Sequence, residues 1–252
     1  MPAQPVLDFH VRLAPAADAL DRLLGGMDRC GIDRAVVCAG GTIDLDRLSE
    51  QLITGEHVET DADNKAVLAA ACASSERLVP FFFANPHRDP AVYQSQAARY
   101  RGLELSPAVH GVALNDERCL ALVRVAGKAG HPVYVVCIDR PGCDVAALVE
   151  LAQRFEAVTF VLGHSGIGNI DLYAINLLRR HRNIFMETSG GYTCVVRAAL
   201  ERLGPDRVLF GSEYPLQHPS VELAKFTALE LTAQCWAQVA WHNAHRLLRQ
   251  EA

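Results

Sequence analysis

The stretch Arg207-Val-Leu-Phe-Gly-Ser-Glu-Tyr-Pro215 consists of a short apolar run, a stop at Gly211 and Ser212, and a carboxylate, Glu213. A run of this kind predicts a buried β-strand that ends at the glycine. In α/β enzymes built on parallel strands, the carboxyl ends of the strands carry the chemistry. The stretch therefore predicts a parallel α/β fold with an acid in its functional site.

Strand-like and helix-like segments alternate along the rest of the chain. The predicted strands cover residues 6–11, 34–39, 78–84, 102–106, 132–138, 158–162, 183–188 and the run that begins at 207. The predicted helices cover residues 16–30, 63–73, 90–101, 120–129, 145–155, 172–180, 195–203, 222–231 and 235–248. About eight strands, each followed by a helix and with no linker between halves, predict one (β/α)8 TIM-barrel domain over residues 1–252.

An open doubly wound sheet is the competing architecture. It usually carries a glycine-rich phosphate-binding turn after its first strand, and this chain has Phe9-His-Val-Arg12 there instead. Residues 42–61 break the alternation after the second strand. An insertion at the carboxyl end of a strand is either a lid over a site or a surface excursion, and both interpretations stay open.

The bulk composition indicates a globular protein that acts on a small molecule. The chain has 252 residues, 50% of them hydrophobic and 21% charged, with a formal net charge of -5. This charge excludes the basic surface that nucleic acid or an anionic membrane would select. No export signal or spanning segment is recognisable, so we expect a cytoplasmic protein. Its eight cysteines form no C-x-x-C pair, and we expect reduced thiols.

Polar residues at the ends of the predicted strands are the candidates for a site. They are Asp8, His10, Arg12, Glu104, Cys137, Asp139, His164, Glu187, Ser189, Glu213 and Tyr214. Asp8, His10 and Arg12 alternate at period two, so we expect all three to point to one face of the strand. Three polar side chains on one face of a half-buried strand need partners or a cavity, which favours a site.

Several candidates also have a structural interpretation. His10 is either a hydrogen-bonded structural histidine or a functional one. Arg12 either forms a salt bridge with Glu213 or Asp139 or binds an anion. His164 lies between two glycines, where the backbone must turn sharply or admit a ligand, and this favours a function.

Two further patterns favour structure over chemistry. Cys137 lies in an apolar strand without a group that would stabilise a thiolate, so a core position is favoured. His242 and His245 have a spacing that can hold a metal, but no third ligand is recognisable in the sequence.

Taken together, these landmarks resemble the amidohydrolase-related family (amidohydrolase 2), TIM-barrel metal-dependent hydrolases and decarboxylases. The matching segments are Asp8-Phe-His10, Pro132-Val, Phe160-Val-Leu-Gly-His164-Ser-Gly166, Asp206-Arg-Val-Leu-Phe-Gly-Ser-Glu-Tyr-Pro215 and Trp241-His-Asn-Ala-His-Arg-Leu-Leu248. The resemblance spans essentially the whole chain and implies the barrel fold.

The family pattern implies a metal held by two histidines of H-x-H, a strand-five histidine and a strand-eight aspartate. Here the second histidine is Arg12, the strand-five position falls on Val136 or Cys137, and the aspartate is Glu213. Arginine stays protonated and has no lone pair to donate, which argues against an ordinary metal site. No cofactor is favoured; if a metal such as zinc is retained, its ligands are His10, Glu213 and Cys137.

The resemblance and the residues together imply a divergent amidohydrolase-like hydrolase that acts on a small, carboxylate-bearing substrate. The expected catalytic residues are His10, Arg12, His164 and Glu213, and the expected substrate-binding residues are Glu104, Asp139, Ser189 and Tyr214. A decarboxylase of the same family and an inactive barrel with a binding or accessory role remain alternatives. The apolar final helices offer an interface for a homodimer.

Overall fold

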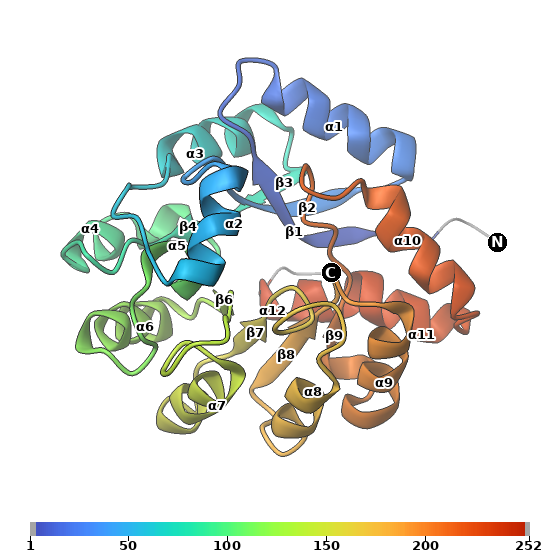
Figure 1. Cartoon of the computed structure of the whole chain (residues 1–252). Coiled ribbons are helices and arrows are strands. Elements are labelled where there is room, and N and C mark those ends of the chain that lie inside the picture. The colour runs from blue at the N-terminus through green and yellow to red at the C-terminus, as the bar shows by residue number, and fades with distance from the viewer. Residues whose placement is uncertain (1–3, 250–252) are drawn as a thin grey trace.

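The structure, a computed structural model, describes residues 4–249 and is built on parallel strands surrounded by helices (Figure 1). The predicted domain begins and ends outside this range, at residues 1–3 and 250–252. The strands are β1 (Leu7–Leu13), β2 (Arg34–Ala39), β3 (Leu78–Pro80), β4 (Phe82–Phe83), β5 (Leu103–Leu105), β6 (Val133–Val135), β7 (Phe160–Leu162), β8 (Ile184–Glu187) and β9 (Val208–Leu209). They form two parallel sheets, β1-β2-β3 and β4-β5-β6-β7-β8-β9.

Backbone hydrogen bonds join these two sheets into one barrel. β3 and β4 are a single strand interrupted at Phe81, whose N–H still donates to Val37 O at 3.0 Å. At the other seam, Phe9 N–H of β1 donates to Phe210 O, just after β9, at 2.8 Å. With β3 and β4 acting as one strand, the closed barrel has the eight strands that the sequence predicts, and the predicted fold class is confirmed.

Helices follow the strands and cover the outside of the barrel (Figure 1). They are α1 (Ala19–Cys30), α2 (Leu45–Thr54), α3 (Asn64–Ala73), α4 (Ala91–Gln94), α5 (Pro107–His110), α6 (Glu117–Ala129), α7 (Val145–Arg154), α8 (Leu172–Leu178), α9 (Thr193–Leu203), α10 (Pro219–Ala228), α11 (Ala233–Ala237) and α12 (Asn243–Leu247). Aspartate side chains cap five of their N-termini, which sets where those helices begin. The five caps are Asp44, Asp63, Asp116, Asp144 and Asp171.

Two predicted helices are not continuous. The segment predicted over residues 90–101 is split into α4 and a short 3-10 turn, Ala97–Arg99. The segment predicted over residues 235–248 contains a π-helical turn, Gln238–His242, between α11 and α12. Within the described residues no helix is long and apolar enough to cross a bilayer.

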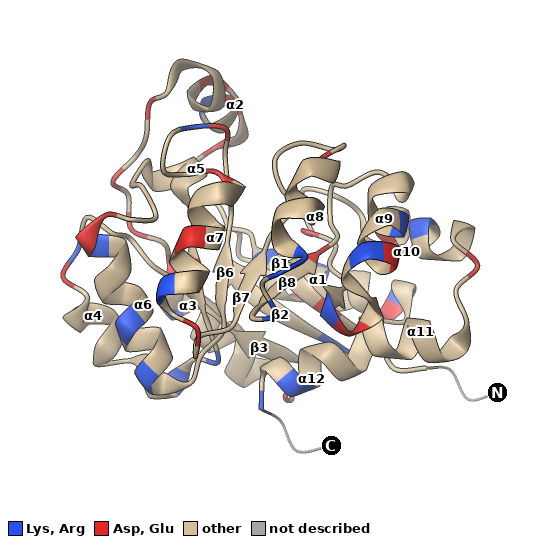
Figure 2. Ribbon diagram, turned by 90° about the horizontal axis from the view of Figure 1, so that it is seen from below, with Lys and Arg blue, Asp and Glu red and all other residues tan. Residues whose placement is uncertain are grey.

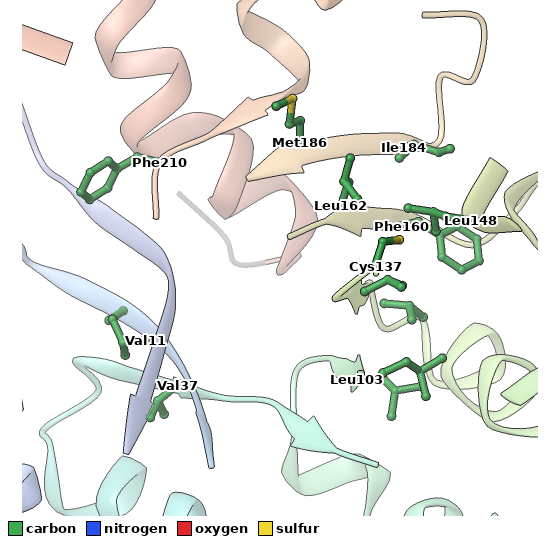
Figure 3. Packing of buried hydrophobic residues seen from close by; sticks show 14 of the residues in the cluster. Val11, Val37, Leu103, Cys137, Leu148, Phe160, Leu162, Ile184, Met186 and Phe210 are labelled. Carbon is green, nitrogen blue, oxygen red and sulfur yellow. The ribbon is translucent and has the colours of Figure 1, made fainter. Parts of the chain in front are cut away.

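The apolar core has two layers, one between strands and helices and one inside the barrel. The outer layer contains Val37, Leu103 and Phe160, and Figure 3 shows part of it. The inner layer contains Leu7, Phe9 and other side chains that point to the barrel axis. Alternate residues of each strand serve the two layers, as expected for strands buried on both faces.

A bulge in β1 changes which side chains face the barrel interior. Asp8 pairs with Ala35 of β2, whereas Arg12 pairs with Cys38, so β1 uses one more residue than β2 over this interval. An extra residue moves the following side chains to the opposite face. The expectation that Asp8 and Arg12 point to one face is therefore wrong. The Asp8 carboxylate instead accepts the N–H of Ser212 at 2.9 Å.

The segment 42–61 contains α2, which projects beyond the ends of the strands in Figure 2. Gln51 of α2 donates from its side-chain amide to Ala108 O of α5. Further along, Val58 is buried, and its N–H donates to Val109 O at 3.0 Å. The segment is thus anchored at two places beside α5, and its function as a lid stays a prediction.

Candidate active site

A cavity of about 640 Å³ opens at the carboxyl ends of the strands. The leucines of α2 and aliphatic residues of α5 line it, so most of its wall is apolar. The ionisable side chains that also line it include Arg12 of β1, His164 after β7 and Glu213 after β9. An apolar cavity with a few convergent polar groups is the usual form of a small-molecule site.

Arg12 is held chiefly by Glu104 of β5. Its Nη2 lies 2.8 Å from Glu104 Oε1, whereas its Nε lies 3.4 Å from Glu213 Oε1. The sequence predicts Glu213 or Asp139 as the partner of Arg12. In the structure Glu213 is a partner, and Glu104 lies closer to Arg12 than Glu213 does. Burial opposes ionisation of Glu104, but the charge of Arg12 and smaller contributions from His10 and Cys38 together outweigh burial and hold the Glu104 pKa well below its usual value.

Glu213 forms a second, shorter ion pair with His164. His164 Nδ1 lies 2.8 Å from Glu213 Oε2. Burial alone raises the pKa of Glu213, but the charge and hydrogen bond of His164, followed by the charge of Arg12, lower that pKa to about 2. Burial lowers the pKa of His164, but Glu213 outweighs it and raises that pKa above its usual value. Each partner therefore stabilises the charged form of the other.

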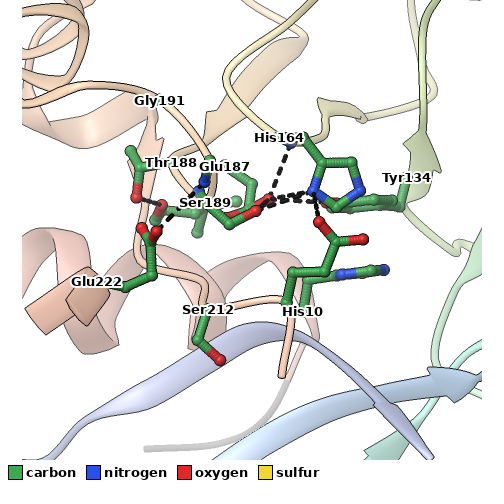
Figure 4. A network of polar contacts seen from close by, with 12 residues as sticks. His10, Tyr134, His164, Glu187, Thr188, Ser189, Gly191, Ser212 and Glu222 are labelled. Carbon is green, nitrogen blue, oxygen red and sulfur yellow. Dashed lines mark hydrogen bonds and ion pairs between the residues drawn. The ribbon is translucent and has the colours of Figure 1, made fainter. Parts of the chain in front are cut away.

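Buried groups behind His164 fix the orientation of its ring (Figure 4). Its Nδ1 lies 2.9 Å from Ser189 Oγ, and that hydroxyl donates to Glu187 Oε2 at 2.9 Å. The Tyr134 hydroxyl donates to the same carboxylate oxygen at 2.7 Å. The backbone N–H of His164 also donates to Glu187, at 3.0 Å. Glu187 thus holds both the backbone and, through Ser189, the ring of His164.

His10 lies beneath the cavity wall and is fully buried. Its ring stacks on Tyr134, with centroids 4.2 Å apart, and meets His164 edge-on at 5.2 Å. Neither ring nitrogen has a hydrogen-bond partner among the described residues, and the nearest charged atom is Glu104 Oε2 at 3.6 Å. Burial, followed by the charge of Arg12, lowers the pKa of His10, so its imidazole is neutral near neutral pH.

Two of the ionisable residues have a left-handed backbone conformation. His164 has φ of 54° and Glu213 has φ of 56°. Side chains other than glycine rarely adopt this region, and such residues concentrate at functional sites. At Glu213 the conformation ends the strand-like stretch and aims the carboxylate at His164.

The expected substrate-binding residues have different surroundings. Asp139 lines the cavity and is exposed. Ser189 is buried behind His164, and Glu104 is buried beneath Arg12, so both contact the ionisable residues instead of the cavity. Tyr214 packs beside Gly26 of α1 and is not part of the cavity wall.

The cysteine near His10 is not the expected one. Cys137 lines the cavity, but among the described residues it belongs to no cluster of potential metal ligands. Cys38 of β2 instead lies with His10 and Glu104 in such a cluster. Cys137 as a ligand of a retained metal therefore stays a prediction that these distances do not support. His245, whose spacing from His242 can hold a metal, packs against Trp241, with ring centroids 4.1 Å apart.

Two residues that support His164 have no role predicted from the sequence. Glu187 is a strand-end candidate without a predicted function, and Tyr134 lies in a segment predicted as an apolar strand. The signal for Tyr134 lies in its position: it alternates with Val133 and Val135, so it points into the barrel while they point outward. A phenol inside a barrel needs a hydrogen-bond partner, and Glu187 supplies it.

Comparison with known proteins places this geometry in a family. A family model described as amidohydrolase matches residues 7–250. The chain belongs to the amidohydrolase family. The resemblance drawn from the sequence motifs is thereby confirmed. No curated protein matches this amidohydrolase-family chain significantly.

Solved structures share the fold at low sequence identity. An uncharacterised TIM-barrel protein from Bordetella bronchiseptica has a TM-score of 0.76 and 19% identity, with 98% of this chain and 99% of that chain covered. A putative 2-pyrone-4,6-dicarboxylic acid hydrolase from Pseudomonas putida has a TM-score of 0.74 and 17% identity, with 99% of each chain covered. A 5-carboxyvanillate decarboxylase from Novosphingobium aromaticivorans, solved with bound manganese, has a TM-score of 0.74 and 15% identity, with 98% and 97% covered.

The manganese in that neighbour raises the question whether this barrel fits a divalent ion. His10, His164 and Glu213 place potential ligand atoms within 4.8 Å of one another, a set of donors that zinc or manganese accepts. However, both Glu213 oxygens already contact nitrogen atoms, one of Arg12 and one of His164, and the charge of Arg12 also faces Glu104. A divalent ion would lie beside a guanidinium that cannot lose its proton. These residues do not fit a resident divalent metal.

Proposed function

We propose that this amidohydrolase-family protein is a hydrolase that opens a small, carboxylate-bearing ester or lactone without a resident metal in the barrel. One observation supports the proposal most: the guanidinium of Arg12 and the ion pair of His164 with Glu213 line the same apolar cavity. The pair supplies an oriented base, and the guanidinium supplies the positive charge that a metal supplies elsewhere in the family.

Arg12 has one donor left for a substrate. Its guanidinium carries five N–H groups, and four of them have partners among the described residues: Glu213 on Nε, Ala39 O and Glu104 on Nη1, and Glu104 on Nη2. The remaining N–H on Nη2 can bind a carboxylate or the oxyanion that forms when a carbonyl is attacked. Charge-assisted bonds of this kind are stronger inside an apolar cavity than in water.

His164 is the proposed general base. Glu213 accepts a hydrogen bond from Nδ1, which leaves Nε2 to carry the lone pair once the ring is neutral. Nε2 has no hydrogen-bond partner among the described residues, and because it is buried, the proposed step requires that a water molecule reach it from the cavity that His164 lines. A water molecule gives a proton to Nε2 and attacks the carbonyl carbon of the substrate. The single bond between that carbon and the alkoxy oxygen of the ester then breaks, and Nε2 returns the proton to the leaving oxygen.

The apolar wall supports a substrate with a compact apolar body. The cavity of about 640 Å³ lies within the usual range for small-molecule sites, and most of its wall is apolar. The structural neighbour described as a putative 2-pyrone-4,6-dicarboxylic acid hydrolase is consistent with a cyclic ester that carries carboxylates. We propose a cyclic ester with a carboxylate as the substrate class. Because Asp139 at the cavity wall carries a negative charge, it would favour a polar group of the substrate near it over a second carboxylate.

Decarboxylation is a second candidate, supported by one feature of the cavity. Glu213 raises the pKa of His164 despite burial, which keeps a proton available to replace a departing carboxylate on carbon. Structural neighbours include proteins described as a 5-carboxyvanillate decarboxylase and a 2,6-dihydroxybenzoate decarboxylase. In this reaction Arg12 would hold the substrate, and His164 would act as an acid.

Incubating the purified protein with a panel of carboxylated lactones and hydroxybenzoates tests the two reactions. The hydrolase proposal predicts a ring-opened acid, formed without release of carbon dioxide. Carbon dioxide release instead would establish the decarboxylase, and no turnover of either class would favour a binding or accessory protein. The double variant Arg12→Gln/Glu104→Gln, which leaves no unpaired buried charge, should lose about 100-fold or more in kcat/KM.

The pH dependence of hydrolysis tests the role of His164 separately. The reaction needs neutral His164, so the rate should fall as pH drops below the raised pKa of that residue. Glu213→Gln removes the charge that raises the pKa, and burial then lowers it, so the acid limb should move to lower pH. An acid limb that stays in place in Glu213→Gln would contradict the assignment of His164 as the base.

A further inference from the structure

A second cluster of potential metal ligands lies outside the cavity described above. It consists of His57 and Glu59, from the segment after α2, and His87, from the loop after β4. Glu59 Oε1 lies 3.5 Å from His87 Nδ1 and 4.0 Å from His57 Nε2. The two imidazole rings stack at 5.3 Å with their planes 5° apart. One atom from each side chain thus converges on a common point.

A hydrogen bond orients the His87 ring with one nitrogen directed at Glu59. His87 Nε2 lies 2.9 Å from the carbonyl oxygen of His110, and a carbonyl can only accept, so Nε2 carries the proton. The lone pair of neutral His87 is therefore on Nδ1, the atom that faces Glu59. Metal-binding histidines commonly donate their second N–H to a backbone carbonyl in this way.

The backbone that carries the other two ligands is anchored. Val58, between His57 and Glu59, is buried and donates its N–H to Val109 O at 3.0 Å. Because alternate side chains of an extended segment share a face, His57 and Glu59 both project away from the buried valine. His57 also packs closely against Gly111, where an added Cβ would lie 2.8 Å from the His57 Cβ. Little ordering remains for a metal to impose on these ligands.

We infer that His57, Glu59 and His87 form a binding site for a divalent transition metal, with zinc the best match. Two imidazole nitrogens and one carboxylate oxygen are ligands that zinc accepts, and a water molecule completes four-coordination. With metal–ligand bonds of about 2.0–2.2 Å, neighbouring ligands of a tetrahedral ion lie about 3.4 Å apart. The 3.5 Å separation of Glu59 and His87 already meets this condition. His57, 44% exposed, has to turn its ring out of the stack with His87 so that its lone pair points at the ion.

Arg118 contacts one of the proposed ligand atoms. Its Nη1 lies 3.3 Å from His87 Nδ1, the proposed ligand atom, while its other nitrogens contact Asp116. The Arg118 side chain is 48% exposed and can keep its contacts with Asp116 as Nη1 moves away. Removing this donor should therefore strengthen metal binding, which gives the site a variant that gains affinity.

The bound ion would connect the segment after α2 to the barrel. His57 and Glu59 follow α2 directly, whereas His87 follows β4. The same two segments already contact each other through Asn85, whose amide donates to Glu59 O at 3.0 Å. A metal bridging them would hold α2 in place beside the cavity, and occupancy of the site would slow exchange of small molecules.

Calorimetric titration of the metal-stripped protein with zinc sulfate near neutral pH tests the site. We expect one zinc ion per chain in the wild-type protein and in His181→Ala, a control that removes a histidine elsewhere. His57→Ala and His87→Ala should each weaken binding at least about 100-fold, more than the loss of an outer hydrogen-bond partner costs. Arg118→Gln should bind zinc more tightly than the wild-type protein.

Two results would overturn the inference. One is zinc binding that persists unchanged in His57→Ala and His87→Ala. The other is zinc binding that disappears in Glu213→Gln, because the ion would then occupy the barrel. Titration with cobalt(II) gives an independent readout: visible absorption of a four-coordinate ion should form in the wild-type protein and in Glu213→Gln but not in His57→Ala.

Discussion

Arg12 shows how one residue changes the chemistry available to a barrel of this family. The sequence places an arginine where the family pattern has a second histidine, and the structure gives that arginine a fully buried carboxylate, Glu104, as its closest partner. A buried ion pair of this kind stabilises little by itself, because both charges lose their hydration. Breaking it leaves an unpaired charge in the core, so each partner becomes necessary once the other is present.

The first prediction concerns this ion pair. Arg12→Gln should destabilise the fold by about 3–5 kcal/mol, because Glu104 then remains buried without a counter-charge. Adding Glu104→Gln should recover most of that loss. Urea unfolding of the two single variants and the double variant measures the effect. Additive losses in the double variant would show that the two side chains do not depend on each other.

The second prediction concerns the pH dependence of stability from Glu213 and His164. The folded pKa of Glu213, about 2, lies below its usual value of 4.5, so its contribution is present above pH 4.5 and is lost as pH falls toward 2. The folded pKa of His164 lies above its usual value of 6.5, so its contribution is present below pH 6.5 and is lost as pH rises through the folded pKa.

The pair should therefore stabilise the protein most between pH 4.5 and pH 6.5. We expect Glu213→Gln to lose the most free energy of unfolding in this window and progressively less outside it on either side. Urea midpoints measured at a series of pH values supply the comparison. A difference between variant and wild type that does not change with pH would disprove the ion pair.

Among the elements, α2 is the one whose position bears most on function. Arg140, in the loop after β6, donates to the backbone oxygens of Gln51 and Glu56 at the end of α2. We predict that Arg140→Ala loosens this end of the helix, because two of its anchors are lost. Hydrogen exchange of the amides of residues 51–56 should become faster, and KM should rise.

Arg124→Ala is the matched control, because it removes an exposed arginine whose ion pair, among residues 4–249, is with Glu117 on α6. Its exchange rates in residues 51–56 should equal those of the wild-type protein. If Arg140→Ala also leaves these rates unchanged, Arg140 does not anchor α2, and the lid interpretation of residues 42–61 loses its main support.

The end of β7 gives a fourth prediction, which concerns packing. A Cβ at Gly163 would lie 2.5 Å from the Tyr134 ring, too close for any side chain. Gly163→Ala should therefore destabilise the protein by about 1–3 kcal/mol and displace the Tyr134 hydroxyl from Glu187. Thermal unfolding of the variant and the wild-type protein measures the loss. In the same experiment Gly25→Ala in α1, where the flexible end of Arg29 is the near group, should be neutral or stabilising.

At the scale of the whole molecule, the periodic features of the sequence were sufficient for the fold. Alternating apolar strands and amphipathic helices predict the barrel, and the stretch ending at Glu213 correctly predicts an acid at the carboxyl end of a strand. The candidates His164 and Arg12 are also brought to one cavity, as expected. These successes rest on local patterns that repeat with a fixed period.

The misses arise from features that have no local pattern. The bulge in β1 moves Asp8 away from the face of Arg12, and one extra residue in a strand leaves no trace in its composition. The pairing of Arg12 with Glu104 joins residues that are 92 positions apart. Likewise, Tyr134 and Glu187 support His164 across neighbouring strands. The homodimer expected from the apolar final helices stays a prediction that sedimentation can test.

If the Arg12 guanidinium stands in place of a metal in this barrel, hydrolysis should not depend on a divalent ion. The variant His57→Ala/His87→Ala lacks the proposed zinc site, so its hydrolytic activity and metal content, measured before and after exhaustive chelation, test this. We expect activity that chelation leaves unchanged, in protein with far less than one metal ion per chain. Activity that disappears with the metal and returns with added manganese or zinc would contradict it.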